Sequence, residues 1–413
     1  MLHIPVLILV ITALLAYLNQ RFLKLPMTIG VMASSLGVSL LLIGLDKLGL
    51  AGAMRLREQE LLASIDFSAV LMQGMLSLLL FAGALHVDLA ELRNYRWQVG
   101  LLAFIGTALS TLVVGVAMWW LLPLLGLPVP LLDCLLFGAL ISPTDPIAVI
   151  GMLKSAHAPA NLEVVIAGES LFNDGVGVVI FSLLLGMAMQ GGNPTVGQAS
   201  MLLLREAGGG LAFGAVLGFG LYYLLRTVDH YQVETLLTLA AVLGGYTLTN
   251  DLHVSGPLAM VVTGLIIGNN GRAEAMSDAT RHHVDLFWEL LDEILNAVLF
   301  VLVGLQVITI HFPIGGIYAL AAGAAAIVVT LLARWLTVGL PFLVFGRAMR
   351  LPDGSAGILT WGGLRGGISI ALALAIPPGH QPQTLLALTY CVVAFSILVQ
   401  GLTFGKVVTR WLK

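Results

Sequence analysis

Two acidic residues, Glu169 and Asp174, lie in the middle of an apolar stretch that runs from Leu162 to Met189. The stretch is long enough to span a membrane, so both side chains fall at the depth of the lipid tails. An ionised side chain there costs about 2.5–3.5 kcal/mol on insertion scales. A chain with two such groups in one span is predicted to use at least one of them to hold a cation or a proton.

Helical geometry separates the two acids. At about 100° per residue, Ser170 and Asp174 lie about 40° apart, with Asn173 beside them, whereas Glu169 and Asp174 lie about 140° apart. Asp174 with the Ser170 hydroxyl is therefore the better ion ligand, and Glu169 needs a permanent counter-charge. The tripeptide Asn173-Asp174-Gly175 often marks a turn. A turn would leave two pieces too short to cross a membrane, so a continuous helix is predicted.

Two other apolar stretches carry signals that interrupt a helix. Residues 142–146 read Ser-Pro-Thr-Asp-Pro, and two prolines three residues apart remove two backbone donors. Residues 362–367 place four glycines around Leu364 and Arg365, which weakens the helix and lets another backbone approach. Asp145 followed by Pro146 is typical of a helix start. A restart at mid-membrane would turn the Thr144 carbonyl and the Asp145 carboxylate toward a polar pocket.

Two arginines also fall deep in apolar stretches. Arg334 is the predicted partner of Glu169, because a guanidinium stays charged at any relevant pH; the alternative is an Arg334 that bonds backbone carbonyls alone. Arg365 is predicted to hold the crossing of the two broken helices by bonding freed carbonyls. It is not expected to contact a cation, because a fixed positive charge repels one.

The composition indicates a membrane protein. The chain is 59% hydrophobic and 10% charged, with a mean hydropathy of +1.00, and no soluble domain of 413 residues would have such a surface. Scarce charge excludes a nucleic-acid-binding patch. Cys134 and Cys391 lie in apolar stretches, as buried thiols do, and the histidines have no metal-ligand spacing, so no cofactor is expected. The N-terminus is apolar from Ile4 without a basic leader, which indicates a retained first span.

Thirteen apolar stretches approach the roughly 20 residues that a spanning helix needs. Loops after odd-numbered stretches and the C-terminal tail carry thirteen Lys and Arg, whereas the other loops carry Lys47, Arg55 and Arg57. The positive-inside rule then predicts an external N-terminus and a cytoplasmic C-terminus. The stretches are 4–19, 27–46, 66–85, 99–122, 130–154, 162–189, 200–226, 233–250, 254–269, 283–310, 315–346, 355–377 and 384–408.

The two interrupted stretches are seven spans apart and so run in opposite directions. Interrupted helices at matching positions of two halves are typical of inverted-repeat transporters, and spans 1–6 are predicted to match spans 8–13. The predicted fold is an all-α polytopic membrane protein in which two broken helices cross at mid-membrane. The tenth span begins with Asp285, Glu289, Asp292 and Glu293, which either favour the helix dipole or form an acidic cytoplasmic funnel.

These motifs resemble the NhaP-type sodium/proton antiporters of the cation:proton antiporter-1 family, to which the eukaryotic sodium/proton exchangers are related. The likeness covers nearly the whole chain. It implies a homodimer in the cell membrane, with an ion-translocating core at about 66–189 and 283–408 and a dimerisation domain at about 1–50 and 200–269. The motifs are Thr144-Asp145-Pro146, Glu169-Ser170-x-x-Asn173-Asp174, His253-Val254-Ser255-Gly256-Pro257 and Gly363-Leu364-Arg365-Gly366.

The resemblance also implies roles for single residues. Asp174, with the positions of Thr144, Asp145 and Ser170, would bind sodium and the proton in turn. Asn173 would steady the pocket, Glu169 and Arg334 would form a structural ion pair, and Asn173 in place of a second Asp would make exchange electroneutral. The chain departs from the family at Ala82, where many members have an acid, and it ends five residues after its last expected span, without a long cytoplasmic tail.

Three alternatives remain open at this point. The first keeps the antiporter and changes the cation to potassium or lithium. The second is an intramembrane aspartyl protease in which Asp145 and Asp174 share a proton, although a protease requires neither the inverted broken helices nor the arginines. The third is a channel, which coupled protonation of a deep carboxylate disfavours. The leading expectation is a transporter, not an enzyme, whose partners are lipid, a small cation and a second copy of the chain.

Overall fold

The computed structural model describes residues 3–48, 70–156, 158–190, 196–309 and 317–411. These residues form helices and connecting turns, and no strand occurs among them. Helices satisfy their backbone groups internally, as the lipid interior requires. The first half contains α1 (His3–Leu18), η1 (Asn19–Leu23), α2 (Met27–Lys47), η2 (Val70–Met75), α5 (Leu76–Leu85), α6 (Leu89–Asn94), α7 (Arg96–Gly100), η3 (Leu101–Gly106), α8 (Thr107–Leu121), η4 (Leu122–Leu125), α9 (Leu131–Ile141), α10 (Ile147–Ser155) and α11 (Ala160–Gln190).

The all-helical fold expected from the sequence is confirmed. Seven helical segments in the described ranges are long and apolar enough to cross a membrane, so the count of thirteen crossings stays a prediction. The second half contains α12 (Val196–Leu225), α13 (Tyr231–Leu252), α14 (Gly256–Ile266), η5 (Ile267–Ala275), α15 (Asp278–Leu305), η6 (Gln306–Thr309), α16 (Ile317–Phe345), η7 (Gly346–Met349), α17 (Ser355–Trp361), α18 (Gly367–Leu374), α19 (Pro382–Phe395), η8 (Ser396–Gly401) and α20 (Leu402–Trp411).

Several expectations from the sequence lie outside the described residues. The third expected span would begin at 66, whereas the described chain resumes at Val70. Arg55 and Arg57, two of the three basic residues assigned to the outer side, and Lys413 in the tail are also outside the described ranges. The predicted orientation therefore stays a prediction.

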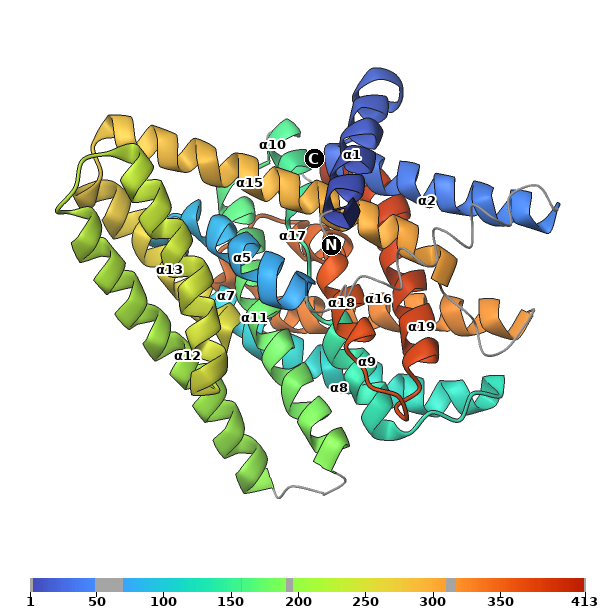
Figure 1. Cartoon of the computed structure of the whole chain (residues 1–413). Helices are drawn as coiled ribbons and strands as arrows, with labels where there is room; N and C mark the ends of the chain where they lie inside the picture. Colours follow the sequence, from blue (N-terminus) through green and yellow to red (C-terminus); the bar gives the residue numbers. More distant parts are fainter. Residues whose placement is uncertain (1–2, 49–69, 157, 191–195, 310–316, 412–413) are drawn as a thin grey trace.

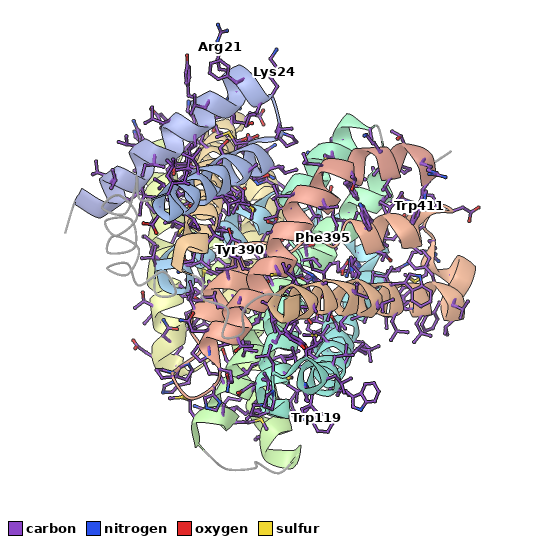
Figure 2. All side chains as sticks on the ribbon, turned by 90° about the vertical axis from the view of Figure 1, so that its right-hand side faces the viewer. Arg21, Lys24, Trp119, Tyr390, Phe395 and Trp411 are labelled. Carbon is purple, nitrogen blue, oxygen red and sulfur yellow. The ribbon has the colours of Figure 1, made fainter. Side chains whose placement is uncertain are left out.

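The helices form two groups. Helix α9 packs against α8, α11 and α18, and α16 packs against α8, α17 and α19. The second group contains α12, α13 and α14, with α5 against α14, and α15 extends from α13 toward α2 along one edge (Figure 1). Large apolar side chains are exposed on many of the helices, and Trp119 and Trp411, labelled in Figure 2, are among them, as expected for lipid-facing surfaces.

Two expected helix starts are wrong. Helix α15 begins at Asp278, after Ser277, whose Oγ accepts a hydrogen bond from the Thr280 amide. Asp285 and the acids that follow it lie about two turns or more inside the helix, so the dipole does not explain them. Helix α10 begins at Ile147 and has no side-chain cap. The N-cap position is Pro146, one residue after the Asp145 expected there, and the Asp145 amide bonds the Leu364 carbonyl of the second break.

Candidate functional site

The two helix breaks meet inside the protein. The first break, 142–146, separates α9 from α10, and the second, 362–366, separates α17 from α18. The amide of Asp145 donates a hydrogen bond of 2.8 Å to the carbonyl oxygen of Leu364. A Cβ atom on Gly366 would lie 2.7 Å from Asp145 Oδ2, so only glycine allows this approach. The crossing of broken helices expected from the sequence is thus present.

Arg365 holds this crossing. Its Nη1 donates to the carbonyl oxygens of Ser142 at 2.5 Å and Pro143 at 2.8 Å, and its amide donates to Ser396 Oγ at 2.8 Å. The side chain is 2% exposed. A charged guanidinium bonds carbonyls more strongly than a neutral donor does, so Arg365 satisfies backbone groups that the first break sets free. These are the carbonyl contacts that the sequence predicted for it.

The Asn-Asp-Gly tripeptide does not form a turn, since α11 runs unbroken from Ala160 to Gln190. Asn173 and Ser170, on the face of α11 predicted from the helical angles, contact Thr144 in the first break. Asn173 Nδ2 donates to Thr144 Oγ1 at 2.8 Å, and Asn173 Oδ1 accepts from the Thr144 amide at 3.2 Å. Thr144 Oγ1 lies 3.0 Å from Ser170 Oγ. These bonds fix the break against α11.

Glu169 lies on a different side of α11 and pairs with Arg334. Arg334 Nη1 and Nη2 donate to the two carboxylate oxygens, the second bond at 2.9 Å. Arg334 Nε and Nη2 also donate to the Leu359 carbonyl, at 3.2 and 3.0 Å. A Cβ atom on Gly363 would lie 2.6 Å from Arg334 Nε. The predicted contact between Glu169 and Arg334 is present, and the glycine break gives the arginine room.

Asp174 faces a cavity of about 590 Å³ that also reaches Thr144 and Asp145. Asp174 is 8% exposed and Thr144 2% exposed. The other polar residues along the cavity come from the loop after α5, from α10, α15 and α18: His86, Lys154, Glu289, Asp292, Glu293, Asn296 and Ser369. Carboxylate, hydroxyl and amide oxygens that converge on one space are the ligands that small hard cations prefer.

Three acids of α15 belong to this cavity, whereas Asp285 pairs with Arg272. Glu289, Asp292 and Glu293 line it, which favours the acidic-funnel alternative over the dipole. Sequence reasoning did not single out Asn296. It lies four residues after Asp292 and seven after Glu289, so the helical period puts it on the same face, and that spacing could have revealed it. Ala82, the position where the family resemblance leads one to expect an acid, also lines the cavity.

A family model described as the transmembrane sodium/hydrogen exchanger matches residues 9–410. This chain belongs to the sodium/hydrogen exchanger family. It is 53% identical over 404 residues to the Na⁺/H⁺ antiporter NhaP of Pseudomonas aeruginosa, covering 97% of this chain and 94% of that one. It is 34% identical over 379 residues to the Na⁺/H⁺ antiporter NhaH of Halobacillus dabanensis, covering 90% and 91%.

A solved structure has the same fold. The sodium/proton antiporter MjNhaP1 of Methanocaldococcus jannaschii, determined at pH 8, superposes with a TM-score of 0.76, covering 98% of this chain and 97% of that one, at 22% sequence identity. The family resemblance read from the four motifs is therefore confirmed. Membership of an exchanger family gives no support to the aspartyl protease alternative.

Proposed function

We propose that the chain is an electroneutral sodium/proton antiporter that binds Na⁺ and H⁺ in turn at Asp174. The observation that carries this proposal is the position of Asp174, a carboxylate in a cavity beside the crossing of two broken helices. The names of the relatives from Pseudomonas aeruginosa and Halobacillus dabanensis support the choice of sodium and protons as substrates.

Competition for one carboxylate explains the coupling. A sodium ion at Asp174 would take further oxygen ligands from Ser170, Thr144 and Asp145, and a proton on Asp174 would remove the charge that attracts the ion. Either occupant neutralises the carboxylate, whereas the ionised group alone is costly to move through a barrier of low polarity. The site therefore changes sides only when it is loaded, and the two substrates never need to meet.

The charge balance supports electroneutral exchange. Glu169 is paired with Arg334 and keeps its charge through the cycle. Asn173 is neutral and is engaged with Thr144, so α11 offers a single carboxylate to the cavity. One sodium then replaces one proton, and the net charge of the moving part is unchanged.

Alternating access requires one part of the protein to move against another. The core expected from the sequence covers 66–189 and 283–408. We propose a smaller mobile core that leaves out α5, because α14 and η5 bind α5 closely to the dimerisation domain. A Cβ atom on Gly268 would lie 2.2 Å from the Leu85 carbonyl oxygen. Asn269 Oδ1 accepts from the Leu89 amide at 2.7 Å, and its Nδ2 donates to the Val87 carbonyl at 3.0 Å.

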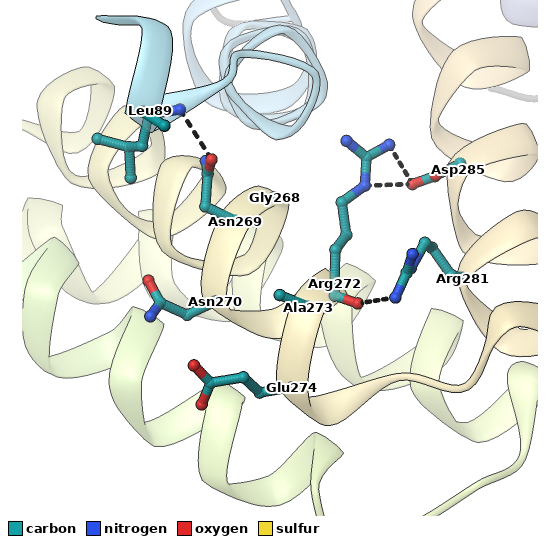
Figure 3. A pocket seen from close by; sticks show the side chains of 10 residues that line it. Leu89, Gly268, Asn269, Asn270, Arg272, Ala273, Glu274, Arg281 and Asp285 are labelled. Atoms are coloured by element: carbon teal, nitrogen blue, oxygen red, sulfur yellow. Dashed lines mark hydrogen bonds and ion pairs between the residues drawn. The ribbon is translucent and has the colours of Figure 1, made fainter. Parts of the chain in front are cut away.

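Helix α15 is tied to the same group. Arg272 Nε donates to Asp285 Oδ1 at 2.8 Å, and Arg272 Nη1 donates to the Leu85 carbonyl at 2.9 Å. Figure 3 shows Arg272 reaching from η5 to Asp285, and Asn269 reaching to Leu89. We therefore assign α5 and α15, with α1, α2 and α12–α14, to the static domain, and residues 96–190 and 317–411 to the core. The Asp174 cavity then lies between the two, lined by α5 and α15 on one side and by α11 and the breaks on the other.

The remaining features of the proposal come from the family resemblance and from the charge of the loops. The protein is proposed to be a homodimer in the cell membrane, with the N-terminus outside and the C-terminus in the cytoplasm. Potassium or lithium in place of sodium is the second candidate, because the family resemblance leads one to expect an acid where Ala82 lines the cavity.

Reconstituted vesicles test the proposal. Purified protein is placed in vesicles with an imposed pH gradient and an internal pH dye, and sodium, lithium or potassium is added in turn. The proposal predicts that sodium collapses the gradient and that an imposed membrane potential does not change the rate. If only potassium collapses the pH gradient, the transported cation is potassium instead of sodium. If none of the three cations changes the gradient, the proposal is contradicted.

A further inference from the structure

A second, much smaller cavity lies on the side of the crossing that Arg334 occupies. Thr330 and Arg334 of α16 line it, together with Gly363 and Arg365 of the second break and Gln400 of η8. It offers about 10 Å³ for the centre of a water molecule, which is near the least that one ordered water needs. It is thus too small for an organic ligand.

Two residues that line this cavity each carry a polar side-chain atom that lacks a hydrogen-bond partner. Thr330 Oγ1 and Arg365 Nε are both buried, and neither has a partner within the described part of the chain. Thr330 is 4% and Arg365 2% exposed. Native proteins rarely leave such atoms unpaired, and a buried polar group without a partner is destabilising. Two unpaired atoms on residues that line one water-sized cavity point to a ligand that both could share.

We propose that one ordered water molecule binds in this cavity and bridges Thr330 Oγ1 and Arg365 Nε. The water accepts from the guanidinium Nε–H and exchanges a hydrogen bond with the threonine hydroxyl, while the Gln400 side chain is a third polar neighbour. Two to four polar partners are what a buried water normally has. A cation is excluded by the two guanidinium groups. The Arg334 charge is already matched by Glu169, and a halide ion beside Arg365 is the competing occupant that a bromide soak tests.

The water gives Thr330 a role that its direct contacts do not show. Arg365 Nη1 is held by the Ser142 and Pro143 carbonyls, and the water would hold the Nε edge of the same guanidinium. Thr330 would then be a positioning residue that ties the crossing of the broken helices to α16. This site does not depend on which cation the protein exchanges, so its test is separate from the transport test.

Thr330→Val distinguishes a hydrated from a dry cavity by the sign of its effect. With the water present, the substitution removes one of its partners, and the melting temperature of the purified protein should fall by about 2 °C, the order expected for one buried hydrogen bond in a chain of this size. Thr330→Ser keeps the hydroxyl, so the bound water should persist in it, whereas its lost methyl group lowers the melting temperature on its own account. If the cavity is dry, Thr330→Val removes an unpaired hydroxyl and leaves the melting temperature unchanged or higher, which would overturn the proposal.

Thr337 provides a matched control on the same helix. It is also 4% exposed, but its hydroxyl already donates to the Arg334 carbonyl at 3.2 Å. Thr337→Val makes the same chemical change at a residue that does not line the cavity. The electron density of the bound water should therefore persist in Thr337→Val. A structure of the full chain at about 2 Å should show water density between Thr330 and Arg365 that is lost in Thr330→Val. Absence of that density in the wild type, or an anomalous bromide peak at the site after a bromide soak, would refute the water assignment.

Discussion

Helix α11 carries two buried acids five residues apart, and their surroundings are opposite. Glu169 is 1% exposed and is closed by two guanidinium nitrogens of Arg334, which is itself anchored on the Leu359 carbonyl. Asp174 faces a cavity shared with Asp145 and Thr144. One helix thus places Glu169 in an ion pair with Arg334 and Asp174 at the cavity. The side of the helix on which a buried acid lies therefore decides whether it faces a counter-charge or a cavity.

The two breaks differ in a complementary way. The proline break, 142–146, frees carbonyl acceptors and presents the Asp145 carboxylate, whereas the glycine break, 362–366, supplies the Arg365 donor and the room for close approach. Neither break would be stable alone at membrane depth, because unpaired backbone groups there are costly. Each break provides what the other lacks, and Asp174 lies beside the junction.

The largest expected effect on transport comes from Asp174→Asn. It should lower the rate of sodium-driven gradient collapse by about 100-fold or more, the equivalent of at least about 2.7 kcal/mol in a barrier, because an amide cannot exchange a proton for a cation. Glu163→Gln is the matched control, since Glu163 lies in the first turn of the same helix and should leave the rate near the wild-type value. Vesicle flux at equal protein density checks both.

The largest expected effect on stability comes from the other acid. Glu169→Gln leaves the Arg334 charge buried without its partner, and breaking a buried ion pair costs about 3–5 kcal/mol. The melting temperature should fall clearly, while Asp174→Asn should not lower it. In the double variant Glu169→Gln with Arg334→Gln, the melting temperature should fall by less than the sum of the decreases in the two single variants. A Glu169→Gln protein that melts normally but does not transport would show that Glu169 is not a structural acid.

A smaller effect is expected where the glycine break approaches Asp145. In Gly366→Ala the added Cβ would lie 2.7 Å from Asp145 Oδ2, so Asp145 must shift away from the cation. The sodium concentration for half-maximal rate should rise about 10-fold, which corresponds to about 1.4 kcal/mol. Gly186→Ala is the control, because a Cβ atom there meets nothing within 4 Å. An unchanged half-saturation value in Gly366→Ala would remove Asp145 from the site.

The smallest effect is expected at the mouth of the cavity. Glu289→Gln and Glu293→Gln reduce the negative potential that concentrates cations there. The initial rate at low sodium should fall by about two- to threefold at low ionic strength, and the difference should disappear at about 1 M salt, where charges are screened within about 3 Å. A deficit that persists at high salt would mean that these acids bind the ion directly.

The sequence predicted the parts of the site that depend on helical period and on backbone chemistry. The angle between Glu169 and Asp174, the breaks around Asp145 and Arg365, and the pairing of Glu169 with Arg334 all follow from spacing, proline, glycine and the cost of an unpaired charge. Contacts between helices distant in the sequence could not be read in this way. Asn296 and the acids of α15 join the cavity only because α15 packs beside the crossing, and the attachment of α5 to η5 depends on Asn269 and Arg272, which have no spacing signal.

Proton release on sodium binding shows directly whether sodium and a proton exclude one another at Asp174. Purified protein in weakly buffered detergent solution, at a pH where the site is protonated, is mixed with sodium chloride while a pH dye is followed. We expect release of up to about one proton per chain with sodium, none with choline, and none in Asp174→Asn. Release that persists in Asp174→Asn would contradict this expectation.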